Sequence, residues 1–131
     1  MNLFKQKYND QLYFLFRIVV GLMFLGHGGQ KLFGWMGGNG VELMSLMGLA
    51  GVIELVGGIL ITLGVFTRLV AAIAAVEMLV AFFKMHVSQG WNPLMNGGEL
   101  ALLYFAAFLV MVAWGNGKLS LEKKLFKKER F

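Results

Sequence analysis

The stretch that most constrains the fold is residues 50–68, an almost wholly apolar run that is long enough to cross a lipid bilayer. It carries a single carboxylate, Glu54, and it ends at Arg68. An acidic side chain in the hydrocarbon core costs about 2.5 to 3.5 kcal/mol on insertion scales, so such a residue needs a partner or a role. Gly51, Glu54 and Gly58 share one helical face, where small residues let a neighbouring helix come close. The run predicts a membrane helix whose Glu54 points into the protein.

Composition supports a membrane protein. Hydrophobic residues make up 58% of the 131 residues and charged residues 15%, which is too apolar for a soluble domain of this size. The chain has no cysteine, so any redox chemistry must come from another molecule. Much of the net charge of +5 comes from the C-terminal tail, with Lys118, Lys123, Lys124, Lys127, Lys128 and Arg130. Basic residues beside a membrane span indicate topology and contact with anionic lipid, and we expect no nucleic-acid partner.

Four apolar segments predict four membrane helices, at about residues 12–33, 48–66, 69–85 and 99–114. Residues 115–131 follow as a basic tail. We therefore expect residues 1–131 to form a single all-α domain, a four-helix transmembrane bundle in the lipid bilayer.

The distribution of cations predicts the orientation of this bundle. An even number of spans puts both termini on one side of the membrane. Lys5, Lys7, Arg68 and the tail lie on that side, against Lys31 and Lys84 near the two longer loops. Both termini are therefore predicted to be cytoplasmic.

This topology brings several ionisable residues to similar depths. Glu54 lies about 9 Å below the outer boundary at the helical rise, at a depth similar to that of His27. We expect one pocket in the outer half to collect candidates for ligand binding or proton transfer from all four helices, namely His27, Lys31, Glu54, Glu77, His86 and Glu99. Arg17 stands apart near the inner face.

Several longer segments also carry a family resemblance. They read R-I-V-V-G-L-M-F-L-G-H-G-G-Q-K-L-F-G from Arg17, A-G-V-I-E-L-V-G-G-I-L-I-T-L-G-V-F-T-R-L-V-A-A from Ala50, and N-G-G-E-L-A-L-L-Y-F-A-A-F-L from Asn96, with W-G-N-G-K-L-S-L-E after them. With these segments the chain resembles the DoxX family of small four-helix membrane proteins, which includes the DoxD-type membrane subunit of thiosulfate:quinone oxidoreductase.

The resemblance covers essentially the whole chain. It implies a bacterial inner (plasma) membrane protein in a quinone- or thiol-linked redox or detoxification system, often with a soluble oxidoreductase as partner. The positions that match the family's polar residues are Arg17, His27, Lys31, Glu54, Arg68 and Glu99.

The candidate residues also have simpler interpretations. Glu54 either pairs with Lys31 or His27 to hold the helices together, or serves a ligand or a proton. We assign Arg17 and Arg68 to structure and topology, and we assign Gly51 and Gly58 to helix packing, within one chain or in a homodimer.

Two kinds of cofactor site could be built from the same residues. The ligand types suit a bis-histidine haem from His27 and His86, or a metal site from His27, Glu54, His86 and Glu99. His86 is typical of a loop, however, and no tight spacing supports a metal. We therefore expect no haem, no metal and no other intrinsic cofactor.

Two classes of function stay open. The first is a redox component that binds a quinone, whose carbonyls need a donor such as His27, Lys31 or Arg17 and a proton-exchanging group such as Glu54. The second is a non-enzymatic membrane scaffold, or a transporter of protons or a small solute.

Overall fold

The computed structural model describes residues 3–129, and the regular elements in that range are all helical. The predicted all-α class is confirmed for these residues. The four long helices are α1 (Leu3–Phe33), α2 (Leu46–Leu63), α3 (Thr67–Ala81) and α5 (Glu99–Trp114). The short elements are the 3-10 turns η1 (Trp35–Gly37) and η3 (Val87–Gln89), the π-helical turn η2 (Phe82–His86), and the helices α4 (Pro93–Asn96) and α6 (Leu121–Phe126).

Helix length and composition identify the membrane spans. Three stretches of the described chain are long and apolar enough to cross a bilayer: Tyr8–Phe33, Leu46–Leu63 and Thr67–Gln89. Helix α5 is apolar but has only 16 residues, which gives a length of about 24 Å against a hydrocarbon core of roughly 30 Å. The protein is therefore an integral membrane protein with three long spans and a shorter fourth apolar helix.

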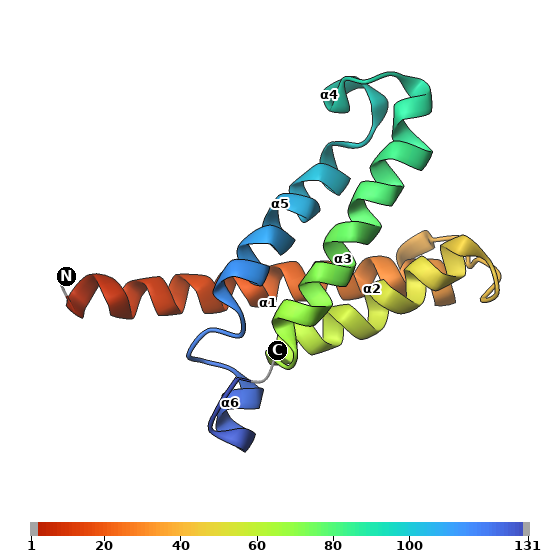
Figure 1. Ribbon diagram of the computed structural model, residues 1–131. Coiled ribbons are helices and arrows are strands. Elements are labelled where there is room, and N and C mark those ends of the chain that lie inside the picture. The colour runs from red at the N-terminus through yellow and green to blue at the C-terminus, as the bar shows by residue number, and fades with distance from the viewer. Residues whose placement is uncertain (1–2, 130–131) are drawn as a thin grey trace.

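Helix α1 begins at Leu3, well before the residue-12 boundary that the apolar pattern predicts. Its 31 residues make a helix of about 46 Å, longer than the bilayer core. Hydrophobicity marks where a helix enters lipid, whereas the polar residues before Leu12 continue the same helix outside it. Figure 1 shows this N-terminal part of α1 extending past the other helices.

The connection between α2 and α3 also differs from the sequence prediction, which puts it at residues 67–68. Helix α2 ends at Leu63 because Gly64 adopts a left-handed conformation with φ of 72°. Thr67 and Arg68 already belong to α3. The turn is therefore residues 64–66.

Helical turns also occur in segments predicted as a loop or tail. Asn92 and Ser120 cap α4 and α6, because their side-chain oxygens accept hydrogen bonds from backbone N–H groups two and three residues later. The tail residue Arg130, which contributes to the predicted topology signal, lies outside the described residues.

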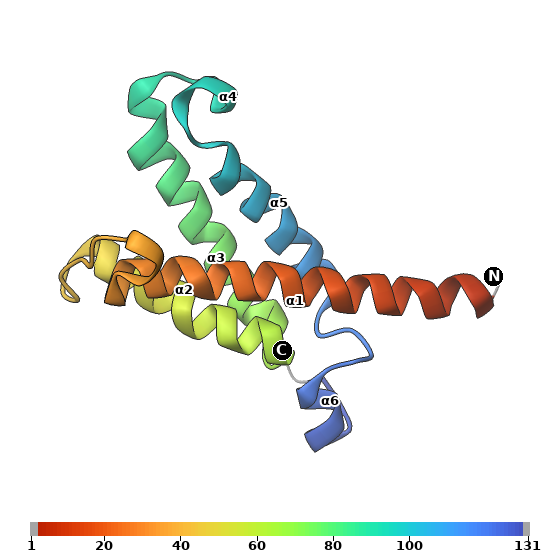
Figure 2. The ribbon, with the colours of Figure 1, turned by 180° about the vertical axis from the view of Figure 1, so that it is seen from behind.

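The long helices form two pairs. Helix α1 packs along α2, and α3 packs along α5, whereas α1 and α5 barely touch. The pairs meet near the α2–α3 turn and diverge toward η1 and α4, as the two opposite views show (Figures 1 and 2). The sequence predicts a four-helix bundle, and the structure arranges its four long helices as two pairs that diverge from one end.

Glycines determine the first pair. A Cβ atom on Gly28 would lie 2.3 Å from the backbone nitrogen of Leu55, and one on Gly58 would lie 2.4 Å from that of Leu25. The backbones of α1 and α2 therefore touch at two levels, where only glycine fits. In lipid, where apolar side chains gain nothing by leaving their surroundings, such close packing is what holds helices together.

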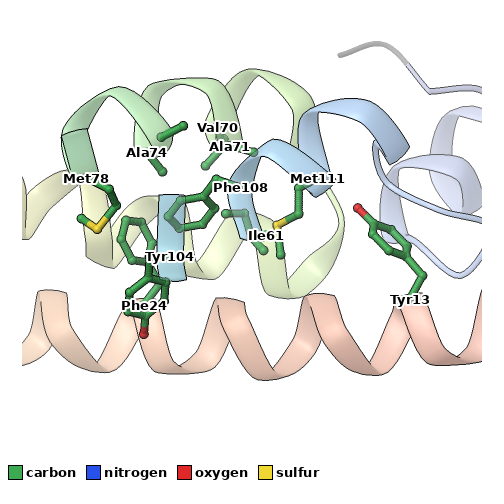
Figure 3. Close-up of a cluster of buried hydrophobic side chains, with 11 residues drawn as sticks. Tyr13, Phe24, Ile61, Val70, Ala71, Ala74, Met78, Tyr104, Phe108 and Met111 are labelled. Carbon is green, nitrogen blue, oxygen red and sulfur yellow. The ribbon is translucent and has the colours of Figure 1, made fainter. Parts of the chain in front are cut away.

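Alanines and aromatic residues determine the second pair and its contact with α1. Ala71 and Ala74 of α3 are fully buried in the core with Phe108 of α5 (Figure 3). Phe108 in turn meets Phe24 of α1 edge-on, with ring centroids 4.8 Å apart. This cluster joins the two pairs near their middle.

A buried polar cluster lies where the helix pairs meet, and Asn116 is its centre. Arg17 is only 1% exposed, and its guanidinium donates hydrogen bonds to the backbone oxygen of Asn116 and, at 3.4 Å, to that of Thr62. The Asn116 side chain accepts from the Thr67 backbone N–H at 3.1 Å and donates to the Glu122 carboxylate. The cluster thus ties the tail to the middle of α1, the end of α2 and the start of α3.

Candidate functional site

The divergence of the two helix pairs leaves a pocket of about 600 Å³ between α2 and α3, which we call the large pocket. Its walls are mostly aliphatic, with residues such as Ala50 and Ile53 from α2 and Ile73 and Val76 from α3. Charged and imidazole groups also reach it, namely Lys31, Glu54, Glu77, Lys84 and His86. The large pocket is therefore an apolar cavity with a few polar groups, the usual character of a small-molecule site.

Lys31 and Glu54 form the closest charged contact of the site. The Lys31 ammonium donates to both carboxylate oxygens of Glu54, at 2.6 and 2.7 Å. Glu54 is 4% exposed, whereas the Lys31 side chain is 23% exposed. The sequence offered Lys31 or His27 as the partner of Glu54, and in the structure Lys31 makes the ion pair. The pair neutralises the buried carboxylate and brings a hydrogen-bond donor to the pocket wall.

Glu77 is the second carboxylate on the large pocket. Both of its side-chain oxygens are buried, and neither has a hydrogen-bond partner within the described part of the chain. A buried carboxyl group without a partner is costly, and such groups in native proteins call for a partner or a function. Glu77 is therefore a buried, unpartnered carboxyl group on a residue that lines the large pocket.

A second, smaller pocket of about 250 Å³ lies between α1, α3 and α5, and we call it the small pocket. Lys31 and Glu54 line it as well, together with His27, Tyr104 and His86. The His27 and Tyr104 rings meet edge-on, with centroids 5.8 Å apart. The Lys31–Glu54 pair therefore stands on the wall of both pockets.

The segment between α3 and α5 positions His86. Its Nδ1 atom lies 3.2 Å from the backbone oxygen of Asn96, within hydrogen-bond distance. Asn96 is buried and organises the loop, since its side chain donates to the Gly90 oxygen at 2.8 Å and accepts from the Gly98 N–H at 2.8 Å. His86 thus lies in the π-helical turn that ends α3, in contact with an ordered loop.

The structure separates the predicted candidates instead of gathering them in one pocket. Lys31, Glu54 and His86 line both pockets, Glu77 lines the large one and His27 the small one. Glu99 is exposed at the start of α5 and is not among the lining residues of either pocket. Glu99 thus lies apart from these two pockets, and its role in ligand binding or proton transfer stays a prediction.

The residues assigned to structure have clear contacts. Arg17 belongs to the buried polar cluster around Asn116, and Arg68 makes a surface ion pair with Glu129 at 3.5 Å. Gly51 and Gly58 both face α1, so the glycine stripe of α2 is used within the chain. In residues 3–129, no group of three or more histidine or acidic side chains is close enough to hold a metal ion.

Sequence reasoning missed Tyr104. It is 7% exposed, and its hydroxyl has no hydrogen-bond partner among the described residues. A tyrosine in an apolar helix gives little signal of its own, because tyrosine side chains are common in hydrophobic cores. Only the packing of the helices shows that Tyr104 lies beside His27 on the small pocket.

Comparison with known proteins identifies the family. The family model DoxX matches residues 12–87, which is more than half of the chain. A protein of Haemophilus influenzae described as uncharacterized is 45% identical over 130 residues, covering 94% of this chain and 97% of the relative. The protein belongs to the DoxX family. The resemblance seen in its sequence is confirmed.

Two further relatives of this DoxX protein differ in what they cover. A second Haemophilus influenzae protein, also described as uncharacterized, is 37% identical over 69 residues, or 53% of this chain and 46% of that protein. A Bacillus subtilis protein named "Putative oxidoreductase CatD" is 28% identical over 118 residues, which is 86% of both chains. No solved structure matches the chain.

Proposed function

We propose that this DoxX protein is the membrane component of a quinone-linked redox system and binds a quinone in the large pocket. The observation that carries the proposal is the largely apolar cavity of about 600 Å³, whose lining residues include Glu77 with its buried, unpartnered carboxyl group. The Lys31–Glu54 pair on the same cavity supplies a cation. The relative named as an oxidoreductase supports the reaction class.

The chemistry of a quinone fits these groups. A quinone has carbonyl oxygens that accept hydrogen bonds, and the Lys31 ammonium is a donor on the pocket wall. The reduced quinol has hydroxyl groups that donate, and the unpartnered carboxyl group of Glu77 is an acceptor. The aliphatic walls suit the ring and the isoprenoid tail. Reduction consumes two electrons and two protons, so the site needs both an electron source and proton-exchanging groups.

The electron source in this proposal is a soluble oxidoreductase. The chain has no cysteine and hence no thiol to carry electrons. The protein lies in the bacterial inner membrane with both termini in the cytoplasm, since most of its cations belong to the N-terminal residues, Arg68 and the tail. Lys31, Glu54 and the pockets then lie toward the outer side.

Quinone binding is testable by ligand-dependent stability of the purified protein in nanodiscs. Addition of a ubiquinone or menaquinone analogue is expected to raise the unfolding temperature, because a ligand at 100 times its Kd stabilises by about 2.7 kcal/mol. Mass spectrometry of lipid extracted from the purified protein is expected to find quinone. Haem and metal would be detected in the same preparation by absorption and elemental analysis.

Two pairs of variants test the location. Ala50→Trp fills the large pocket and is expected to abolish the shift, whereas Ala106→Trp on the exposed face of α5 is expected to retain it. Glu77→Gln is expected to weaken binding, and Glu99→Gln is expected to leave it unchanged. Equal shifts in all four variants would refute quinone binding in the large pocket. No shift in the wild-type protein would favour a scaffold or a transporter.

A further inference from the structure

The two pockets share one wall. Lys31, Glu54, Met78, Ala81 and His86 line both of them, so the ion pair is reached from either side. The sides differ in character: the large pocket opens between the aliphatic faces of α2 and α3, whereas the small pocket adds His27 and Tyr104. A ligand in the large pocket and a solute in the small one would therefore contact the same two charges.

The small pocket has the properties of a site for water. Its volume of about 250 Å³ exceeds the roughly 10–15 Å³ of probe volume that one water needs, so several waters fit. Water also needs polar partners, and the lining residues include an ammonium, a carboxylate and two imidazoles. The edge of the Tyr104 ring meets His27 at this wall, with ring centroids 5.8 Å apart.

The small pocket reaches the surface at its outer end. Gly97, which lines it there beside the 86–98 loop, is exposed. The inner end is closed by Phe24, which is fully buried. Water is therefore expected to enter from the side of the 86–98 loop, opposite to the buried polar cluster around Asn116.

We infer that the small pocket is a water-filled vestibule through which Glu54 exchanges protons with the aqueous phase outside the membrane. His27, Lys31, Glu54 and His86 are its polar lining, and the large pocket, although some of these groups reach it too, is mostly aliphatic. The inference rests on the proposed quinone site for its use: each quinone reduced there takes two electrons from the soluble partner and two protons through the vestibule. His27 is then a positioning residue for water and does not touch the quinone.

The absence of cysteine makes the test direct, since a single introduced thiol is unique in the chain. Charged methanethiosulfonate reagents cross lipid poorly and react with the thiolate, which forms in water and not in hydrocarbon. Glu54→Cys and Ala101→Cys place a thiol on the small pocket, and Leu103→Cys places one on the exposed, lipid-facing side of α5. The labels are added to proteoliposomes of known orientation.

Glu54→Cys and Ala101→Cys are expected to react at least tenfold faster than Leu103→Cys from the outer side, and slowly from the inner side. Filling the vestibule with Ala101→Trp is expected to protect Glu54→Cys, whereas Leu103→Trp is expected not to. Ala101→Cys keeps the test valid if Glu54→Cys fails to fold. Equal rates at Ala101→Cys and Leu103→Cys, or faster reaction from the inner side, would overturn the inference.

Quinone stabilisation measured on the same proteins separates the two proposals. Thiol labelling without a quinone-induced shift would remove the quinone site and leave the vestibule in place. A quinone-induced shift without labelling of Ala101→Cys would overturn the vestibule alone.

Discussion

Breaking the Lys31–Glu54 pair from its two ends is expected to have unequal costs. Lys31→Met leaves a carboxylate that is 4% exposed without its two hydrogen bonds of 2.6 and 2.7 Å. Loss of one partner of a buried ion pair costs about 3–5 kcal/mol. At 1.4 kcal/mol per factor of ten, the folding equilibrium falls between about a hundredfold and a few thousandfold.

Glu54→Gln is expected to cost less, about 1–3 kcal/mol, because the Lys31 side chain is 23% exposed and its ammonium can turn to water. The double variant Lys31→Met with Glu54→Leu removes both charges and is expected to lie within about 1 kcal/mol of the wild type. The double variant should therefore be more stable than Lys31→Met alone.

These differences are measurable by reversible SDS titration in mixed micelles, followed by tryptophan fluorescence. Lys84→Met is the matched control, because Lys84 lines the large pocket but is exposed, and its change is expected to stay within about 0.5 kcal/mol. Strictly additive losses in the double variant, or a Lys31→Met loss no greater than that of the control, would refute the ion pair as a buried, coupled contact.

Two further predictions concern packing. Gly28→Ala puts a methyl group 2.3 Å from the Leu55 nitrogen and is expected to cost about 1–3 kcal/mol in the same SDS titration. The control Gly26→Ala meets only the flexible end of a methionine at 3.6 Å and is expected to be nearly neutral. Equal effects of the two variants would contradict the close contact of α1 and α2. Asn116→Ala removes the side-chain hydrogen bonds that hold residues 115–129 and is expected to accelerate tryptic cleavage of these residues severalfold. An unchanged cleavage rate would show that the polar cluster around Asn116 does not attach the tail.

Several properties follow from local sequence patterns. Apolar runs of membrane length determine the helices, since a polypeptide in lipid must satisfy its backbone hydrogen bonds within each segment. The spacing of Gly51, Glu54 and Gly58 predicts that they share one face of the helix and point into the protein. In the structure all three contact residues of α1. These are facts about single helices, and periodicity describes single helices well.

Helix ends were harder to predict. The pattern marks the lipid boundary, so it missed the first turns of α1, which continue into water with polar residues. The turn between α2 and α3 lies three residues earlier than predicted, because α2 ends before Gly64 and not before Thr67. Hydrophobicity and helicity are different properties, because a helix can continue with polar residues after it leaves the membrane.

The sequence by itself determined that this chain is an all-α membrane protein of the DoxX family, with charged residues that must face inward. Only the tertiary structure decided which helices pair and where they diverge. The close contact of Gly28 with Leu55 and the burial of Phe108 against Phe24 are contacts between distant segments, and no local pattern encodes them. Those contacts left Glu99 outside, brought Tyr104 to His27, and divided the expected site into two pockets on either side of one ion pair.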